Sequence, residues 1–345
     1  MITAAGCAPR ERGGETVPAE PDEGETMADH RDAATGPLGR LALARSTVNR
    51  DAELRIDEPA LAAAWSNPDS RVVVVSEGRA FVLDEPDPLL PGATRPRLVT
   101  LAAYDAPEGD RYLLGRDERG HAFFAVPAET LPGRLDTDAR PASLREVGTQ
   151  LSDRDAGLLT HAVALEYWHR SHRFCSRCGN RTEVASAGHI RRCAQCGTEH
   201  YPRTDPAVIM AVTDADERLL LGRASAWDAR RFSVLAGFVE PGESLEQAVA
   251  REVAEEAGLT VTSVAYLGSQ PWPFPCSLML GFTATVEDPE RFRADGTELQ
   301  EVRWFTRSEL AAAAASGDVV LSGRISIARA LIEHWYGGEV VSAAG

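Results

Sequence analysis

The chain has 345 residues, of which 43% are hydrophobic and 26% charged, and its formal net charge is −16. This length exceeds one typical domain, so two or three domains are expected. No apolar run is long enough to cross a membrane, and the acidic surface argues against general binding to nucleic-acid backbones. The composition predicts a soluble, multidomain globular protein without a membrane partner.

Residues 1–35 are rich in Gly, Pro, Glu and Thr and hold almost no large apolar side chain. Such a segment cannot bury enough apolar surface to fold, so we expect a disordered tail. No hydrophobic signal core follows Met1, which predicts a cytoplasmic protein, and Met27 is an alternative start.

A first folded unit is expected over residues 36–165. It would contain two strands about a Ser-Glu-Gly turn, a further strand, a hairpin and a helix, at 71–83, 97–102, 112–126 and 152–172 respectively. The sequence LLGR occurs at 113–116 and again at 220–223, each time at the end of a predicted strand. A duplicated fold whose first copy had lost its active site would leave such an echo.

Four cysteines form two C-x-x-C pairs, Cys175 with Cys178 and Cys193 with Cys196, and a glycine follows each pair. This spacing predicts a zinc ribbon over 166–203, in which four thiolates hold one structural zinc ion per chain. Two disulfides or a redox role are the alternatives, and the absence of an export signal favours zinc. Arginines surround the pairs and form either a solvated surface or an RNA contact: Arg173, Arg177, Arg181, Arg191 and Arg192.

The segment Gly237–Leu259, GFVEPGESLEQAVAREVAEEAGL, contains the residues that we expect to take part in catalysis. Glu252, Glu255 and Glu256 stand at i, i+3 and i+4, so they share one face of a helix, and Gly258 is placed for a left-handed cap. An apolar series predicts the face that packs on a core: Ala250, Val253, Ala254 and Ala257. Crowded carboxylates repel one another unless a cation lies among them, and all-oxygen donors suit Mg²⁺ or Mn²⁺ acting on phosphates. A solvated glutamate face is the alternative.

This segment fits the Nudix box G-x5-E-x7-R-E-U-x-E-E-x-G-U at every fixed position, so the chain resembles the Nudix hydrolases. These enzymes cleave nucleoside diphosphates linked to another group. Arg251 is expected to pair with Glu243 and hold the loop against the helix. Around the box, strands are expected at 207–213, 218–222, 261–267, 278–286 and 301–305, with a closing helix at 325–336 and a tail at 338–345.

Residues 269–277 read SQPWPFPCS. Three prolines exclude a helix or a central strand, so we expect a stiff loop that fixes Trp272 and Phe274. Aromatic rings beside a metal–phosphate centre would offer a stacking surface for a base or a nicotinamide, and a plug over a core edge is the alternative.

Together with the ribbon, this motif makes the chain resemble the NADH pyrophosphatases, whose members are also described as hydrolases of NAD-capped RNA. The resemblance implies an α+β chain: a Nudix α/β/α sandwich with a mixed sheet over 204–337, preceded by the four-cysteine zinc ribbon and by an N-terminal degenerate Nudix-like domain. It also implies a homodimer that shares residues across the active site.

The resemblance further implies the site. Two or three Mg²⁺ or Mn²⁺ ions would be held by Glu252, Glu256, Glu298 and the carbonyl of Ala236, with Glu301 as the alternative to Glu298. Glu255 would be a supporting ligand or the base. The substrate would lie against the following residues: Tyr201, Phe238, Gln270, Pro271, Trp272, Pro273, Phe274, Pro275, Cys276, Ser277 and the backbone near Ala328.

The implied reaction is metal-dependent hydrolysis of NAD(H) to NMN(H) and AMP. Removal of the NAD cap from RNA by the same chemistry is the alternative, and ADP-ribose hydrolysis would leave SQPWPFPCS unexplained. A non-catalytic nucleotide sensor or zinc-ribbon scaffold is a further alternative, but all the box glutamates are present.

Overall fold

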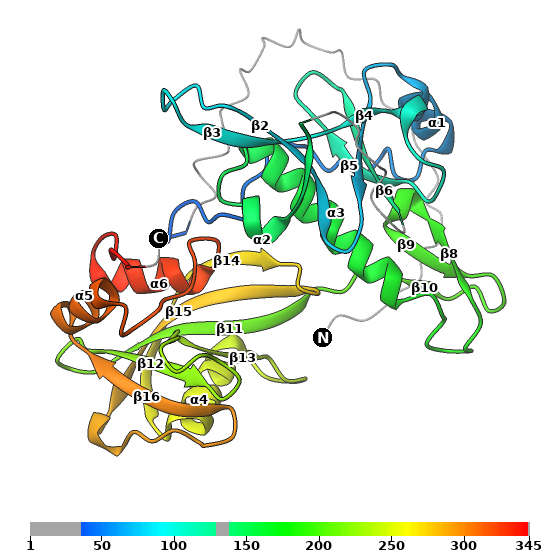
Figure 1. Ribbon diagram of the computed structural model, residues 1–345. Helices are drawn as coiled ribbons and strands as arrows, with labels where there is room; N and C mark the ends of the chain where they lie inside the picture. Colours follow the sequence, from blue (N-terminus) through cyan, green and yellow to red (C-terminus); the bar gives the residue numbers. More distant parts are fainter. Residues whose placement is uncertain (1–35, 129–137, 344–345) are drawn as a thin grey trace, which may run out of the picture. The chain divides into compact units, whose positions relative to one another are not determined.

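Two small sheets and one long helix make up the first part of the chain (Figure 1). The computed structural model describes residues 36–128 and 138–343, so the expectation for residues 1–35 lies outside the described residues. One sheet has the order β4 (Leu101–Ala102), β1 (Arg71–Val75), β6 (Ala122–Pro127), β5 (Tyr112–Arg116). The other has the order β3 (Thr94–Leu98), β2 (Arg79–Pro86), β7 (Arg140–Ser143). The helices are α1 (Glu58–Ser66), α2 (Leu144–Val147) and α3 (Asp153–Ser171).

The strands, the hairpin and the long helix predicted here are confirmed, with one difference. The single strand expected over 97–102 is two strands, because the chain leaves one sheet for the other. The Val99 N–H still donates to Phe81 of β2, whereas Leu101 pairs with Val72 of β1.

Helix α3 is fixed by capping at its start and by buried carboxylates along its length. Ser152 caps it by accepting a hydrogen bond from the Asp155 N–H at 3.2 Å. The buried Glu166 carboxylate accepts from the N–H groups of Glu77 and Gly78, at 2.6 and 2.8 Å. The Ser-Glu-Gly turn is therefore held against the helix by charge-assisted hydrogen bonds.

The ribbon is a three-stranded sheet in the order β10 (Glu199–His200), β9 (Ile190–Cys193), β8 (Thr182–Ala185). Two histidines hold it to the first module: His169 of α3 hydrogen-bonds the Gly188 carbonyl, and His189 hydrogen-bonds the Leu113 carbonyl, each at 2.8 Å. Arg191 is buried and donates to Thr182, so it belongs to the interior rather than to a basic surface patch.

The last part of the chain is a sandwich of helices on both faces of a mixed sheet (Figure 1). The sheet order is β14 (Thr260–Trp272), β15 (Ser277–Glu287), β11 (Asp205–Thr213), β12 (Leu219–Ala224), β16 (Leu299–Phe305), and β13 (Leu235–Phe238) also pairs with β11. Strands β11 and β15 are parallel and the remaining pairs antiparallel.

Side chains alternate between the two faces of β11, so each face carries its own core. Val208, Met210 and Val212 pack with α4 (Leu245–Ala257). Ile209 and Ala211 pack with α5 (Arg307–Ser316) and α6 (Ile327–Tyr336). This arrangement confirms the predicted Nudix-type α/β/α sandwich, whereas α5 was not predicted because its run of alanines has no apolar periodicity.

Two sequence-based expectations in this part are wrong in detail. Residues 269–272, assigned to a loop, belong to strand β14; this is an edge strand, where Pro271 costs no ladder hydrogen bond to a further neighbour. The core face of α4 also differs from the predicted series. Ala254 is exposed and Ala248 and Val249 are buried instead, because a methyl group is tolerated on either face.

Segments at both ends of the described chain pack onto the domains. The Leu38 N–H donates to the Leu267 carbonyl of β14, and Leu43 is buried in the core of the first module. At the other end, Val340 is 1% exposed and the Ala343 N–H donates to Ala314 of α5. Residues 338–343, expected as part of a tail, are therefore packed against the sandwich.

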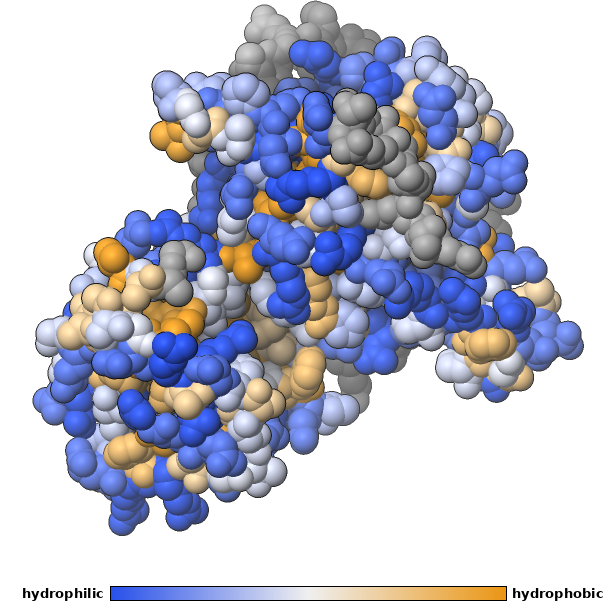
Figure 2. Space-filling model, viewed as in Figure 1, coloured by the Kyte–Doolittle hydropathy of each residue, from blue (hydrophilic) through white to orange (hydrophobic). Residues whose placement is uncertain are grey.

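The face in Figure 2 is mostly hydrophilic, with apolar residues scattered in small patches. Across the described ranges, no helix has the length and apolarity needed to cross a membrane.

Buried histidines predict an acid-sensitive first module. Burial and the neighbouring Arg50 hold the pKa of His161 well below its usual value, and burial lowers the pKa of His189 to about 4. Because these folded-state pKa values lie below the unfolded value, the histidines stabilise the fold fully above about pH 6.5, and this stabilisation is lost as the pH falls.

We expect His161→Gln to reduce the pH dependence of the unfolding free energy between pH 6.5 and 5 by up to about 1.4 kcal/mol per pH unit. Urea denaturation at several pH values measures this slope. The exposed His334→Gln is the matched control and should keep the wild-type slope. An unchanged slope in His161→Gln would contradict the assignment.

Candidate active site

Helix α4 is defined by its sequence at both ends. Ser244 and Gln247 form a reciprocal capping box at its start. Gly258 ends it with a left-handed φ of 67°, as predicted. The helix thereby presents its acidic residues at fixed positions beside the loop that runs from β13.

The three glutamates of the helix do not have the same surroundings. Glu252 and Glu256 are buried, with 8% and 6% of their surface exposed, and lie on the same stripe as Val249 and Val253. The Glu255 side chain is 61% exposed. The prediction that all three share a face holds for the spacing, but only two of them point toward the sheet.

Gly237 makes room for the first of these carboxylates. A Cβ atom built at position 237 would lie 1.9 Å from the Glu252 carboxyl carbon, so no other residue fits without displacing this side chain. The box therefore requires glycine for close approach rather than for backbone conformation.

Arg251 connects the loop to the helix, as predicted. It donates to both carboxylate oxygens of Glu243, at 2.7 and 2.9 Å, and to the Phe238 carbonyl at 2.8 Å. Its Nη1 also donates to Glu252 and Glu255, at 2.8 and 3.0 Å. The hydrogen bonds that Arg251 donates to Glu243 lower the pKa of Glu243 to about 2, so the Glu243 carboxylate stays charged.

Glu256 is the most perturbed acid of the site. Burial, followed by repulsion from Glu252, Glu298 and Asp295, raises its pKa to about 8. Its Oε2 atom is buried and has no hydrogen-bond partner within the described part of the chain. The backbone of Ala236 hydrogen-bonds the same carboxyl group. A buried carboxylate oxygen without a donor is costly unless a cation completes it.

Glu298 lies at the end of the loop before β16, and the loop is ordered by a residue that sequence reasoning missed. Asp295 accepts hydrogen bonds from the N–H groups of Thr297, Glu298 and Leu299, at 3.2, 3.0 and 2.8 Å. The D-x-x-E spacing could have indicated this Asx-type turn. Glu301 forms ion pairs with Arg223 and Arg303, which leaves Glu298 as the uncommitted carboxylate.

The donor set fits a hard divalent cation. The candidate donors are the carboxylates of Glu252, Glu256 and Glu298 and the main-chain carbonyl of Ala236. They include the Oε2 atom of Glu256, which has no hydrogen-bond partner among the described residues. Among the described residues, the cysteines alone bring three or more potential ligand atoms within 4.8 Å of one another, and Arg251 bridges Glu252 and Glu255.

The cysteines form a tetrad, as predicted. Their four Sγ atoms all lie within 4.8 Å of one another, with Cys175–Cys196 and Cys178–Cys193 separations of 3.7 and 3.5 Å. Tetrahedral zinc with Zn–S bonds of about 2.3 Å places sulfurs about 3.8 Å apart, so the tetrad has the size for this ion. The Gly179 and Gly197 N–H groups each close a knuckle by donating to the carbonyl of the first cysteine, at 2.9 Å.

The residues of the β14–β15 hairpin that were predicted to contact the substrate have different surroundings. Trp272 and Phe274 pack against the core of the first module, and the Arg145 guanidinium lies over both rings, at 4.8 and 3.9 Å from their centroids. Gln270 is 1% exposed; it accepts from the Leu43 N–H and donates to the Ile325 carbonyl. These contacts join the hairpin to the rest of the chain, and no sequence signal indicated the partners.

The other residues that were predicted to contact the substrate differ in their solvent exposure. Tyr201 and Phe238 are exposed, at 61% and 59%, and Phe238 ends the strand that leads into the box. Ala328 is buried in the first turn of α6. Pro271, Pro273, Cys276 and Ser277 line a separate cavity on the side of α3, and Pro275 contributes to a neighbouring one.

The sequence matches three family models along its length. They are the NADH pyrophosphatase-like rudimentary NUDIX domain over residues 69–168, the NADH pyrophosphatase zinc ribbon domain over 170–201 and the NUDIX domain over 203–322. The fold and the box thus define a Nudix hydrolase, and the first model confirms that the N-terminal module is a degenerate Nudix-like domain.

Comparison with similar proteins shows to which family of Nudix hydrolases the chain belongs. The chain is 43% identical over 308 residues to the NAD-capped RNA hydrolase NudC of Mycobacterium bovis, an alignment that covers 85% of this chain and 94% of the relative. The values are the same for the protein of that name from Mycobacterium tuberculosis. The NAD-capped RNA hydrolase NUDT12 of Homo sapiens is 39% identical over 204 residues, covering 54% of this chain and 43% of the relative. The chain belongs to the NADH pyrophosphatase (NAD-capped RNA hydrolase) family of Nudix hydrolases.

The contact at Gly237 gives a direct test of the site. We expect Gly237→Ala to displace the Glu252 carboxylate and to weaken Mn²⁺ binding at least about tenfold, because one donor is moved from its place. Isothermal titration with Mn²⁺ measures this change. Gly323→Ala is the matched control, since a Cβ there meets open space. Equal Mn²⁺ affinity in the two variants would contradict the assignment.

Proposed function

We propose that this chain hydrolyses the pyrophosphate bond of NAD(H), giving NMN(H) and AMP. The observation that carries the proposal is the buried pair Glu252 and Glu256, with one carboxylate oxygen that has no hydrogen-bond partner in the described chain, beside strand β13, in which only glycine fits at position 237. Kinship with the NADH pyrophosphatases supports the choice of substrate.

The residues assigned to the catalytic ions are Glu252, Glu255, Glu256, Glu298 and the carbonyl of Ala236. Two or three Mg²⁺ or Mn²⁺ ions are proposed, since hard cations prefer oxygen donors. Bound divalent ions would neutralise charge on the diphosphate oxygens and lower the pKa of a coordinated water.

The protein's own groups then position the reactants and move one proton. A water oxygen attacks one phosphorus in line, the bond from that phosphorus to the bridging oxygen breaks, and a carboxylate takes the water's proton. We assign this role to Glu255. Arg251 holds its Oε2 at 3.0 Å, while the exposed side chain leaves the other oxygen accessible.

The four cysteines are assigned one structural zinc ion per chain. A closed four-thiolate shell leaves no coordination position for a substrate, so this ion would stabilise the ribbon. Thiolate ligands persist in a reducing compartment, which is the basis for placing the protein in the cytoplasm.

A homodimer is part of the proposal. Tyr201 and Phe238 are large aromatic residues that are more than half exposed, although the family resemblance assigns both to the substrate. A second copy that covers them would complete an aromatic surface for a base or a nicotinamide.

Removal of NAD caps from RNA is the second candidate. The names of the relatives favour it, and so does the ribbon surface, where Arg173, Arg177 and Arg181 are exposed beside the exposed ring of Phe174. Arginine charge and an aromatic face are what a single-stranded RNA contacts.

The catalytic assignment predicts a loss of turnover in Glu256→Gln. We expect AMP release from NADH with Mn²⁺ to fall by at least about a thousandfold, because an uncharged amide cannot replace the anionic donor. The fold should persist, as judged by circular dichroism and zinc content. Glu246→Gln, an exposed change in the first turn of the same helix, should keep wild-type activity. Near-normal activity in Glu256→Gln would refute the metal assignment.

The choice between the two substrates can be tested on the ribbon arginines. If capped RNA is a substrate, changing Arg173, Arg177 and Arg181 together to Gln should lower kcat/KM on an NAD-capped transcript and leave kcat/KM on NADH unchanged. The loss should shrink as the salt concentration rises, because phosphate contacts are screened. An equal effect on both substrates would argue against an RNA path over the ribbon.

A further inference from the structure

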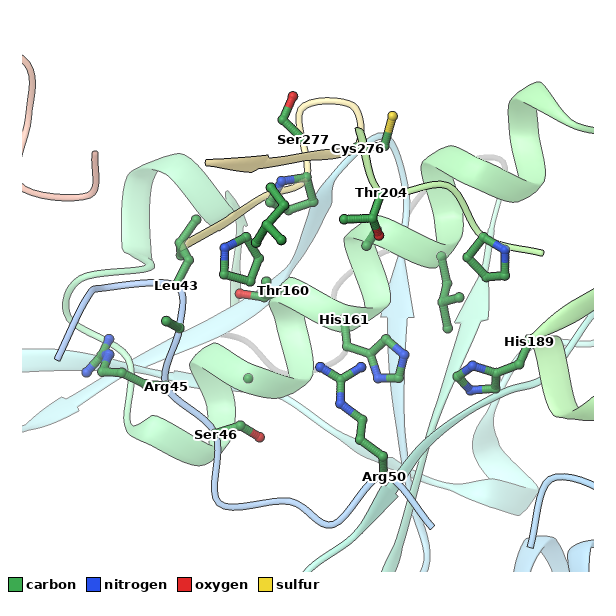
Figure 3. A pocket seen from close by; sticks show the side chains of 18 of the residues that line it. Leu43, Arg45, Ser46, Arg50, Thr160, His161, His189, Thr204, Cys276 and Ser277 are labelled. Atoms are coloured by element: carbon green, nitrogen blue, oxygen red, sulfur yellow. The ribbon is translucent and has the colours of Figure 1, made fainter. Parts of the chain in front are cut away.

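A cavity of about 430 Å³ lies beside α3 (Figure 3), and none of the residues that line it belongs to α4. Its walls come from several places in the chain: the segment that begins at Leu43, helix α3, His189 of the ribbon, Pro202 and Thr204 before β11, and the hairpin of β14 and β15. Pro271 and Leu278 are register partners in that hairpin and both line the cavity. The volume falls in the range of small-molecule sites.

The cavity is basic, although the protein as a whole is acidic. Arg50 lies at its edge and Arg55 in its wall, and within the described residues no carboxylate oxygen forms an ion pair with either of them. Asp51, which attracts Arg55, has its ion pair with Arg116 at 3.1 Å. The Nε of Arg55 is buried and has no hydrogen-bond partner in the described chain. An anion would therefore meet uncompensated positive charge and a free donor.

Two histidines face each other beside these arginines. The rings of His161 and His189 have centroids 5.3 Å apart, and Figure 3 shows the Arg50 guanidinium directed toward His161. His189 donates from Nε2 to the Leu113 carbonyl, and His161 hydrogen-bonds the Leu114 carbonyl. One ring nitrogen of each remains available, and a nearby anion would favour its protonation.

Thr160 supplies a further donor. This residue is 6% exposed, and its Oγ1 is buried without a hydrogen-bond partner among the described residues. It lines the cavity one position before His161 on α3 (Figure 3). A buried hydroxyl without a partner is costly, so a ligand that accepts its proton would recover this free energy.

We propose that this cavity is a second ligand site, which binds a phosphate-bearing small molecule of nucleotide size or less. The phosphate would lie among Arg50, Arg55 and the two histidines, while the Thr160 hydroxyl, which Figure 3 shows on the Leu43 side of the cavity, would donate to the organic group. Two fixed positive charges match a phosphomonoester dianion, and planar guanidinium groups suit its oxygens. The leucine and proline walls would receive the organic group. No residue of α4 lines this cavity, and the proposal does not rest on the hydrolytic function. Pro271, Pro273, Cys276 and Ser277 are shared with the set that the family resemblance assigns to the substrate, whereas Arg50, Arg55, His161 and His189 are not.

The test is equilibrium binding to the full, zinc-containing chain without added Mg²⁺ or Mn²⁺, so that the glutamate site does not retain phosphates. Isothermal titration is run with AMP, inorganic phosphate and adenosine. We expect AMP to bind with a Kd below about 1 mM and adenosine not to bind, because the phosphate supplies the recognition. Equal affinity for phosphate would identify free phosphate as the ligand, and tighter binding of AMP would identify a nucleotide.

Two variants and one control make the test specific. Arg50→Met and Thr160→Val should each weaken binding, the first by at least about tenfold, whereas Arg291→Met, an 80% exposed change elsewhere, should not. Histidine NMR should show the pKa values of His161 and His189 rising on binding, while the chemical shifts of the exposed His334 do not change. Absence of binding, or binding that Arg50→Met leaves intact, would overturn the proposal.

Discussion

The hydrogen-bond network of Arg251 is the constraint on which the active site depends. One guanidinium group holds Glu243 with two hydrogen bonds, reaches the Phe238 carbonyl and contacts both Glu252 and Glu255. Without this central positive charge, the acidic residues of the loop and helix would repel one another. The bidentate geometry also fixes the loop in a way that a lysine could not.

The position of Arg251 also separates the carboxylates by function. Glu243 is fully engaged and has a lowered pKa, which suits a structural partner. Glu256 forms no ion pair with Arg251 in the described chain; burial and its acidic neighbours raise its pKa to about 8, which suits a carboxylate proposed to bind a cation. Neighbouring acids of the loop and helix thus differ: Glu243 holds the loop, and Glu256 is among those proposed to bind the ions.

The sequence predicted much of this arrangement because the box encodes local geometry. The helix, its cap at Gly258, the pairing of Arg251 with Glu243 and the cysteine tetrad all follow from fixed spacings along the chain. What sequence reasoning missed depends on distant segments. The burial of Gln270 needs Leu43 and Ile325, and the covering of Trp272 and Phe274 needs Arg145. Periodicity carries no information about such partners, and the three prolines led to a loop being predicted for residues 269–272, which belong to β14.

These distant contacts give the degenerate first module a physical role. Strand β14 is an edge strand, and its last residues have β15 as their only strand partner in the described sheet. The first module stabilises them: Arg145 lies over the two aromatic rings, and the Leu43 N–H binds the buried amide of Gln270. An edge hairpin without such support would fray, because a two-stranded ribbon is marginally stable in water. The module that lost its glutamates therefore orders the hairpin on which the proposed substrate contacts of the active copy depend.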